Sequence, residues 1–308
     1  MRHVKPSPVK TLSTRAALAL FAAVIFAWGF NWPVAKLTLA EGMSPLWMAT
    51  IRSGIAVGVL FVLLLLSGNL RRPRAGDWPV VWGITLLHMV AYAALIATAL
   101  QYLPAGRSVV LGYTHPLWVV PGALIFLGER LTPARAIGVL IGLAGIALLF
   151  NPAEVDWSNA DVRRGNGMLM LASLCWAASI LQIRAHKWVS TPFQLVFWEV
   201  LLATILLAVL ALVLEGSPSV EWTPRLVLLF GYGGVFGVAL AYWAMAMVNR
   251  SVPAVTTSLG ILATPAVGIV TSMVVLDEPF NATLLVALVM IIGGIALGTL
   301  TRPAPRRV

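Results

Sequence analysis

Two opposite charges stand inside long apolar stretches of this sequence, where charged side chains are rare. Arg52 lies in the run 45–66 and Glu199 in the run 192–214, each seven residues after a proline that can begin a helix. At about 1.5 Å per residue, both would lie about 10 Å inside their helices. Ionisable groups in such surroundings are costly and usually face a cavity or a partner. We predict that Arg52 and Glu199 act in gating, coupling or substrate contact, with static bonding between helices as the alternative.

Aromatic and polar side chains recur in the middle of other apolar runs. His88 and Tyr92 are four residues apart and therefore share one face of a helix. Aromatic walls with a few amide and hydroxyl groups can hold an apolar side chain while binding its amino or carboxylate end. The same residue types also pack in membrane interiors and interfaces, which is the alternative explanation. The predicted substrate-binding residues are Trp28, Asn31, His88, Tyr92, His115, Trp176, Ser179, Gln182, Tyr242 and Trp243.

The composition places these residues in a membrane protein. The chain has 308 residues, of which 60% are hydrophobic and 10% charged, whereas soluble domains have about 25% charged residues. About 20 consecutive apolar residues span the hydrocarbon core as a helix, and the runs lack the alternation of a membrane barrel. The predicted fold class is an all-α integral membrane protein with ten transmembrane helices. Their predicted ranges are 16–35, 45–66, 79–101, 106–127, 133–150, 166–183, 192–214, 226–248, 253–276 and 282–300.

Basic residues are distributed unevenly over the loops between these helices. If the N-terminus is cytoplasmic, fifteen of the 21 Lys and Arg residues lie on the inner side and five on the outer side. Because such a bias sets orientation in a membrane, we expect a multi-pass membrane protein with both termini in the cytoplasm. The formal charge of +10 is then explained without a nucleic-acid partner. The basic start continues into an apolar run without an obvious cleavage site, which favours a retained first helix over a signal peptide.

The two halves of the sequence repeat each other. Pro116 and Glu129 recur as Pro265 and Glu278, and the letters GIAL recur at the same spacing of 149 residues. Five helices in each half mean that the second half enters the membrane from the opposite side. Such inverted repeats surround a central substrate cavity near the midplane and work by alternating access. The expected organisation is a cytoplasmic tail at 1–15, a first repeat at 16–150, an external linker at 151–165, a second repeat at 166–301 and a cytoplasmic tail at 302–308.

Four prolines at equivalent places of the two halves are predicted hinges, because proline removes a backbone donor and kinks or ends a helix. They are Pro104, Pro116, Pro253 and Pro265. Glu129 and Glu278 each come just before a predicted helix start, where a carboxylate favours the positive end of the helix dipole. We interpret them as fixing a turn, with a coupling role as the alternative. Gly138 and Gly142 have the spacing that lets membrane helices approach closely.

Several stretches resemble EamA-type members of the drug/metabolite transporter superfamily. The first helix contains WGFNWPVAK, the second begins with SPLWMATIR, and the two halves end in GERLTPARAIGVLIGLAGIALL and DEPFNATLLVALVMIIGGIAL. The resemblance extends over almost the whole chain and is greatest to the YddG-type amino acid exporters. It implies a secondary transporter that exports small metabolites such as amino acids. The chain departs from the small multidrug branch, whose first helix has a proton-coupling glutamate, since residues 16–35 contain no acid.

Other classes of function lack their signatures in this sequence. It contains no G-x-S-x-G elbow, no H-E-x-x-H helix and no G-x-x-x-x-G-K-[ST] loop, so neither an enzyme nor direct use of ATP is expected. Phosphorylated substrates would need several buried basic groups, whereas the predicted helices offer only Arg52. The expected substrate is therefore a small neutral or zwitterionic molecule. Export of other small solutes or drugs, a channel and a membrane enzyme are the alternatives.

The single cysteine, Cys175, excludes a disulfide framework and a cysteine-based zinc site. No cofactor and no metal are predicted. The expected partners are a small-molecule substrate and the lipid bilayer, and a monomer is the expected state.

Overall fold

The computed structural model describes residues 12–129, 131–151, 155–218, 220–252, 254–279 and 281–300, and these residues form helices and loops without a strand. The first half contains α1 (Thr14–Ala40), α2 (Pro45–Leu66), η1 (Ala75–Asp77), α3 (Trp78–Gly83), η2 (Ile84–Tyr92), α4 (Ala93–Ala99), α5 (Ala105–Gly112), α6 (His115–Leu127) and α7 (Pro133–Leu149). The second half contains α8 (Ala160–Ala185), α9 (Pro192–Leu214), α10 (Pro224–Gly231), η3 (Tyr232–Leu240), α11 (Ala241–Ser251), α12 (Ala254–Gly260), α13 (Ala263–Leu276) and α14 (Ala282–Leu300). The predicted tail at 302–308 lies outside the described residues.

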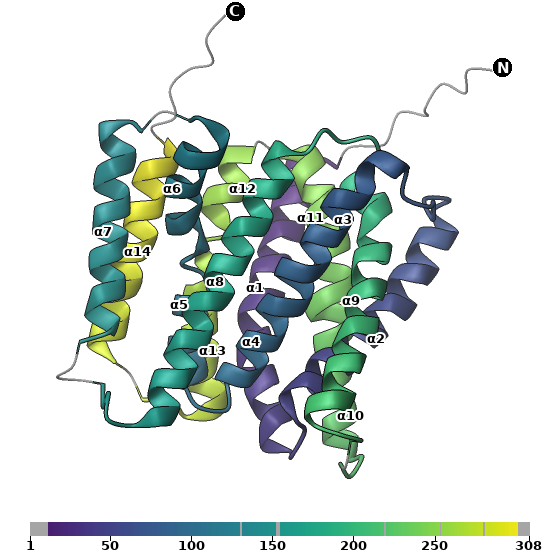
Figure 1. Ribbon diagram of the computed structural model, residues 1–308, viewed down its shortest axis with the longest axis horizontal. Coiled ribbons are helices and arrows are strands. Elements are labelled where there is room, and N and C mark those ends of the chain that lie inside the picture. Colours follow the sequence, from purple (N-terminus) through teal and green to yellow (C-terminus); the bar gives the residue numbers. More distant parts are fainter. Residues whose placement is uncertain are drawn as a thin grey trace, which may run out of the picture.

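These elements line up as ten apolar segments that cross one bundle (Figure 1). In the described part of the chain, eight helical segments are long and apolar enough to cross a membrane, and α7 and α13 are shorter apolar helices of 17 and 14 residues. α13 follows α12 after two residues, and the two together form the ninth segment. The predicted all-α membrane fold with ten transmembrane segments is confirmed.

The two halves interrupt their helices at equivalent places. The third and eighth segments widen into π-helical turns, η2 and η3, whose first residues are 148 positions apart. The fourth segment breaks between α5 and α6, and the ninth breaks between α12 and α13. α6 lies at the upper end of the bundle and α13 at the lower end (Figure 1). The second half therefore repeats the first in inverted orientation.

Polar caps fix the last loop of each half. Thr132 Oγ1 accepts a hydrogen bond from the Arg135 amide at 3.3 Å, and Asn281 Oδ1 accepts one from the Leu284 amide at 3.0 Å. Each bond satisfies an amide that a helix start leaves unpaired. α2, α7, α9 and α10 also begin with proline, which has no amide hydrogen to lose in the first turn.

The outer surface of the bundle is apolar. Phe126, Leu228 and Val274 are 76%, 73% and 75% exposed. Lipid tails solvate such side chains as well as another helix does, so burial of large apolar groups gives membrane helices little reason to associate. The described helices thus present to the bilayer the surface that a soluble protein would bury.

Glycines bring α7 and α14 into close contact, and the two helices run side by side in Figure 1. Gly138 and Gly294 face each other so closely that a Cβ on either would overlap the carbonyl oxygen of the other. A Cβ on Gly142 would overlap the Leu117 side chain. This packing agrees with the role predicted for Gly138 and Gly142.

Candidate functional site

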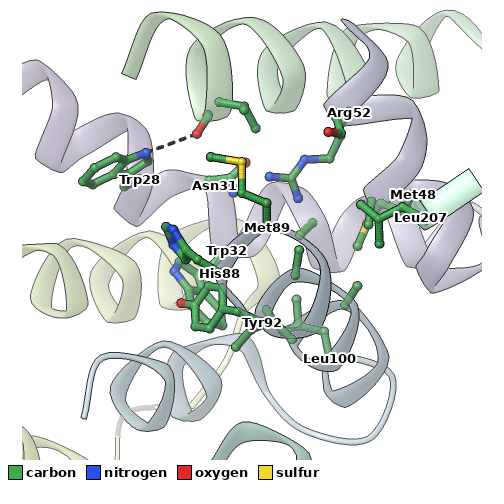
Figure 2. Close-up of a pocket in the computed structure, with 18 of the residues that line it drawn as sticks. Trp28, Asn31, Trp32, Met48, Arg52, His88, Met89, Tyr92, Leu100 and Leu207 are labelled. Atoms are coloured by element: carbon green, nitrogen blue, oxygen red, sulfur yellow. Dashed lines mark hydrogen bonds between the residues drawn. The ribbon is translucent and has the colours of Figure 1, made fainter. Parts of the chain in front are cut away.

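A cavity of about 180 Å³ lies between the two halves of the protein. α1, α2, η2 and α4 line it from the first half, and α8, α9, η3 and α11 line it from the second. Figure 2 shows part of its lining, with aromatic rings on one side and the Arg52 guanidinium on the other. Of the residues predicted to act in substrate binding or gating, it brings together Trp28, Asn31, Arg52, His88, Tyr92, Trp176 and Tyr242.

The cavity extends from the middle of the helices toward one end of the bundle. Met48 lies near the start of α2, Leu100 follows the end of α4, and Leu207 lies in the second half of α9. The basic residues of the sequence predict that these helix ends face outside. The lining thus runs from the middle of the bundle to its expected external end.

Trp176 of α8 is the centre of the aromatic wall. The His88 ring stacks on it with centroids 4.9 Å apart and an angle of 9° between the planes. The Tyr92 ring lies 4.8 Å away, and the Tyr113 ring meets Trp176 edge-on at 5.5 Å. Stacked and edge-on arrangements are the favourable ones for aromatic pairs. A flat apolar group of a substrate could pack against this wall.

Arg52 and Asn31 form the polar side of the cavity. The Arg52 guanidinium points toward Asn31 and Met89 (Figure 2). Glycines of η3 make room for both side chains: a Cβ at Gly233 would lie 2.8 Å from Arg52 Nε, and one at Gly237 would lie 2.6 Å from Asn31 Oδ1. Neither Arg52 Nε nor Asn31 Oδ1 has a hydrogen-bond partner among the described residues. Buried polar atoms are rarely left so, and both side chains line the cavity.

Trp28 joins the two halves beside the cavity. Its Nε1 donates a hydrogen bond to the carbonyl oxygen of Gly237 at 3.2 Å, which Figure 2 shows as a dashed line. Its ring meets the Tyr242 ring edge-on with centroids 6.1 Å apart. α1 of the first half is thereby held against η3 and α11 of the second.

A second cavity, of about 390 Å³, lies between α6, α7, α8 and α14. Tyr113 lines both cavities. His115 lines the second one, and its ring stacks on the Trp176 ring with centroids 3.6 Å apart. The stacked rings of His115 and Trp176 therefore stand as a wall between the two cavities.

The equivalent glutamates of the two halves make different contacts. Glu129 lies at the mouth of the second cavity and pairs with Arg184 and, at 3.1 Å, with Arg135. Glu278 instead accepts hydrogen bonds from the first two amides of α5, at 2.6 and 2.9 Å. The crevice beside Glu278 has a volume of about 30 Å³, against about 390 Å³ beside Glu129. The symmetry of the repeat is thus broken at these two loops.

Four predicted substrate-binding residues do not line the first cavity, and one of them, His115, lines the second. Ser179 is fully buried, and Gln182 Nε2 donates a hydrogen bond to the carbonyl oxygen of Pro79 at 2.7 Å. Trp243 packs beside Val24 and the start of α11. Trp243 points about 100° away from Tyr242 around the helix axis and is not part of the cavity lining.

Glu199 is buried in α9, 5% exposed, and its Oε1 has no hydrogen-bond partner among the described residues. It forms no ion pair with Arg52 within that part of the chain. The phenol of Tyr242 interacts electrostatically with both Glu199 and Arg52. The two mid-helix charges therefore remain separate, with the phenol in the electrostatic range of each.

Three of the four predicted hinge prolines lie at helix boundaries. Pro104 directly precedes α5, and Pro116 and Pro265 lie in the first turns of α6 and α13, just after the two breaks. Pro253 lies outside the described residues. The breaks are found where hinges are expected, and movement about them stays a prediction.

Sequence reasoning missed Tyr113 and the apolar lining of the cavity. Tyr113 belongs to the letters GYTHP, a polar interruption of an apolar run, and that interruption is a usable signal. Apolar lining residues have no such signal because each helix offers many apolar candidates. They include Met48, Met89, Ile96, Leu100, Val200, Leu207 and Val238.

Comparison with known proteins places this architecture in a family. The model of the EamA-like transporter family matches residues 15–151 and again residues 163–300. An uncharacterized transporter of Bacillus subtilis, YvbV, is 25% identical over 284 residues, which cover 92% of this chain and 91% of the relative. The aromatic amino acid exporter YddG of Ancylobacter novellus is 27% identical over 301 residues, which cover 94% of this chain and 99% of the relative. A crystal structure with 22% identity covers 96% of this chain and 100% of its own, with a TM-score of 0.64, and shares the fold.

Proposed function

The chain belongs to the EamA-like transporter family, and we propose that it is a secondary transporter that exports amino acids with aromatic or other neutral side chains. The observation that carries the proposal is the cavity between the halves, where the aromatic wall around Trp176 faces the guanidinium of Arg52. Such a site suits a molecule with one apolar and one charged end. The similarity over nearly full length to an exporter of aromatic amino acids gives further support.

The proposed mechanism is alternating access, in which the two halves exchange equivalent conformations. In its support, one crevice beside an equivalent glutamate is large while the other is nearly closed. In the other state, the crevice beside Glu278 would open and the one beside Glu129 would close. The broken segments α5–α6 and α12–α13 are the proposed hinges, because a helix that is already interrupted can rotate without losing further hydrogen bonds. Glu199 fits a gating or coupling role, since its side chain is buried and its Oε1 has no hydrogen-bond partner among the described residues.

The proposed place of action is the inner membrane of a bacterium, with both termini in the cytoplasm. An even number of crossings puts the start of α1 and the end of α14 on the same side. The excess of basic residues predicts that this side is the cytoplasm. We propose a monomer as the working unit, because both halves of the cavity come from one chain.

The direct test is counterflow in liposomes that contain the purified protein. Liposomes loaded with unlabelled phenylalanine should take up labelled phenylalanine faster than unloaded ones, and the uptake should saturate. Counterflow and saturation distinguish a carrier from a channel. Equal rates in loaded, unloaded and protein-free liposomes would contradict the proposal.

Export of another small solute or drug is the second candidate, because most of the cavity lining is apolar and would accept other flat molecules. The same liposomes decide between the two. Counterflow of a hydrophobic cation without counterflow of any amino acid would favour the second candidate.

A further inference from the structure

Arg52 is a cation inside the bundle that the described residues leave without a counter-ion. The ion pairs of the described residues do not include it, and its Nε has no hydrogen-bond partner. A buried cation is costly unless an opposite charge or hydrogen-bond acceptors satisfy it. An anion that enters the cavity would supply the missing counter-charge.

The surroundings hold the guanidinium in one direction. Gly233 of η3 provides the room beside it, since a Cβ there would lie 3.0 Å from Arg52 Cδ and 2.8 Å from Nε. The group points into the cavity toward Asn31 and Met89, away from Met48 and Leu207 (Figure 2). A guanidinium whose stem is fixed can offer its terminal N–H groups as a planar fork, which matches the geometry of a carboxylate.

We propose that Arg52 binds the carboxylate of the transported molecule and makes this transporter selective for carboxylic acids over amides and amines of the same shape. The inference rests on the proposed function and names the carboxylate as the substrate group that the site recognises. With the carboxylate on Arg52, the apolar end of the substrate lies toward His88, Tyr92 and Trp176. Asn31, whose Oδ1 is unpaired, lies beside the same end of the cavity.

A different explanation is that Arg52 pairs with Glu199 in another conformation. The two residues occupy equivalent positions in α2 and α9, and Tyr242 interacts electrostatically with both. In that case, loss of the Arg52 charge would slow the transport of every substrate alike. Binding to the carboxylate predicts instead a loss that depends on the substrate.

The test compares phenylalanine with phenylalanine amide, which differ in the carboxylate alone, by equilibrium binding to the purified protein. A hydrogen-bonded charge pair predicts that the wild type binds the acid about 10- to 100-fold more tightly than the amide. Arg52→Gln should bring this ratio close to one, and Arg52→Lys should keep part of it. Met48→Leu is the matched control, because it changes an apolar lining residue one turn away on the same helix face. It should alter the binding of both ligands by the same factor.

A third ligand, 3-phenylpropanoate, separates this inference from the proposed function. If 3-phenylpropanoate shows the dependence on Arg52 and phenylalanine does not bind, the inference stands and the proposed amino acid substrate is wrong. If phenylalanine is transported but the wild type binds acid and amide equally, or Arg52→Gln keeps the ratio, the inference is wrong and the function stands. Where Arg52→Gln does not fold, the ratio of acid to amide binding by the wild type still tests the inference, because equal binding would contradict it. Absence of binding for all three ligands would contradict both.

Discussion

Glu278→Gln should open the crevice between α5 and the loop that precedes α14. The Glu278 carboxylate accepts hydrogen bonds from the first two amides of α5, at 2.6 and 2.9 Å. Lys36 lies beside this contact and donates to the carbonyl oxygens of Leu100 and, at 3.0 Å, Leu103. Glutamine has the same shape but only one acceptor oxygen, so the substitution removes the negative charge and one of the two hydrogen bonds.

The size of the effect follows from the two hydrogen bonds. A hydrogen bond to a charged group contributes about 1.5–3 kcal/mol, and one between neutral groups about 0.5–1.5 kcal/mol. Glutamine therefore loses one bond of about 1.5–3 kcal/mol and weakens the other by about 1 kcal/mol, or about 2.5–4 kcal/mol in all. Because every 1.4 kcal/mol is tenfold, a free energy of this size changes the ratio of two conformations about 60-fold or more.

Cysteine alkylation measures this ratio. Met273 lines the crevice, so Met273→Cys in a Cys175→Ser background reports its opening to a membrane-impermeant maleimide added from outside. Glu278→Gln should raise the alkylation rate about 60-fold or more. Ala160→Cys, exposed at the start of α8, is the control and should react at the same rate with and without Glu278→Gln. An unchanged rate at position 273 in a folded variant would refute the reasoning, because the carboxylate would then not hold the crevice closed.

Three further substitutions test the packing of the site and of the bundle. Gly237→Ala should weaken phenylalanine binding about tenfold, because the added Cβ would overlap the side-chain amide of Asn31, which lines the cavity. Gly231→Ala is the control, because a Cβ at that position meets open space. Gly294→Ala should lower the melting temperature in detergent, because overpacking against α7 costs about 1–3 kcal/mol, whereas Gly293→Ala, also facing open space, should not. Trp176→Ala should reduce counterflow about tenfold or more at low substrate concentration, because it removes the ring on which the aromatic wall is built; equal counterflow at matched protein density would contradict this.

The fold was predictable because lipid imposes simple rules. Continuous apolar runs, the bias of basic loops and the recurrence of residues such as Pro116 and Glu129 at a fixed spacing predict ten segments in two inverted halves. The widened turns η2 and η3 were not predicted. A π-helical turn depends on how a helix packs against its neighbours, and no local pattern of residues announces it.

The site residues were predictable where a polar or aromatic side chain interrupts an apolar run, and not where an apolar residue stands among other apolar residues. Arg52, His88 and Trp176 stand out in apolar runs, and the structure gathers them at one cavity. Gln182 is just as unusual in its apolar run, yet its side chain donates a hydrogen bond to the carbonyl oxygen of Pro79, in the first turn of α3. Its position on α8 turns it away from the cavity, and only the helix arrangement decides which face meets which neighbour. The difference in size between the crevices beside Glu129 and Glu278 was also not predictable from the sequence, because it depends on how the helices pack around each loop.

The central claim is that the substrate passes through the cavity between the two halves. Ala93 lines this cavity and is half-buried, so Ala93→Cys in the Cys175→Ser background can be alkylated there by a small thiol reagent. Saturating phenylalanine should slow this reaction severalfold and leave the reaction of Ala160→Cys unchanged. If phenylalanine is transported while the reaction at position 93 keeps the same rate, the substrate does not occupy this cavity and the account is wrong.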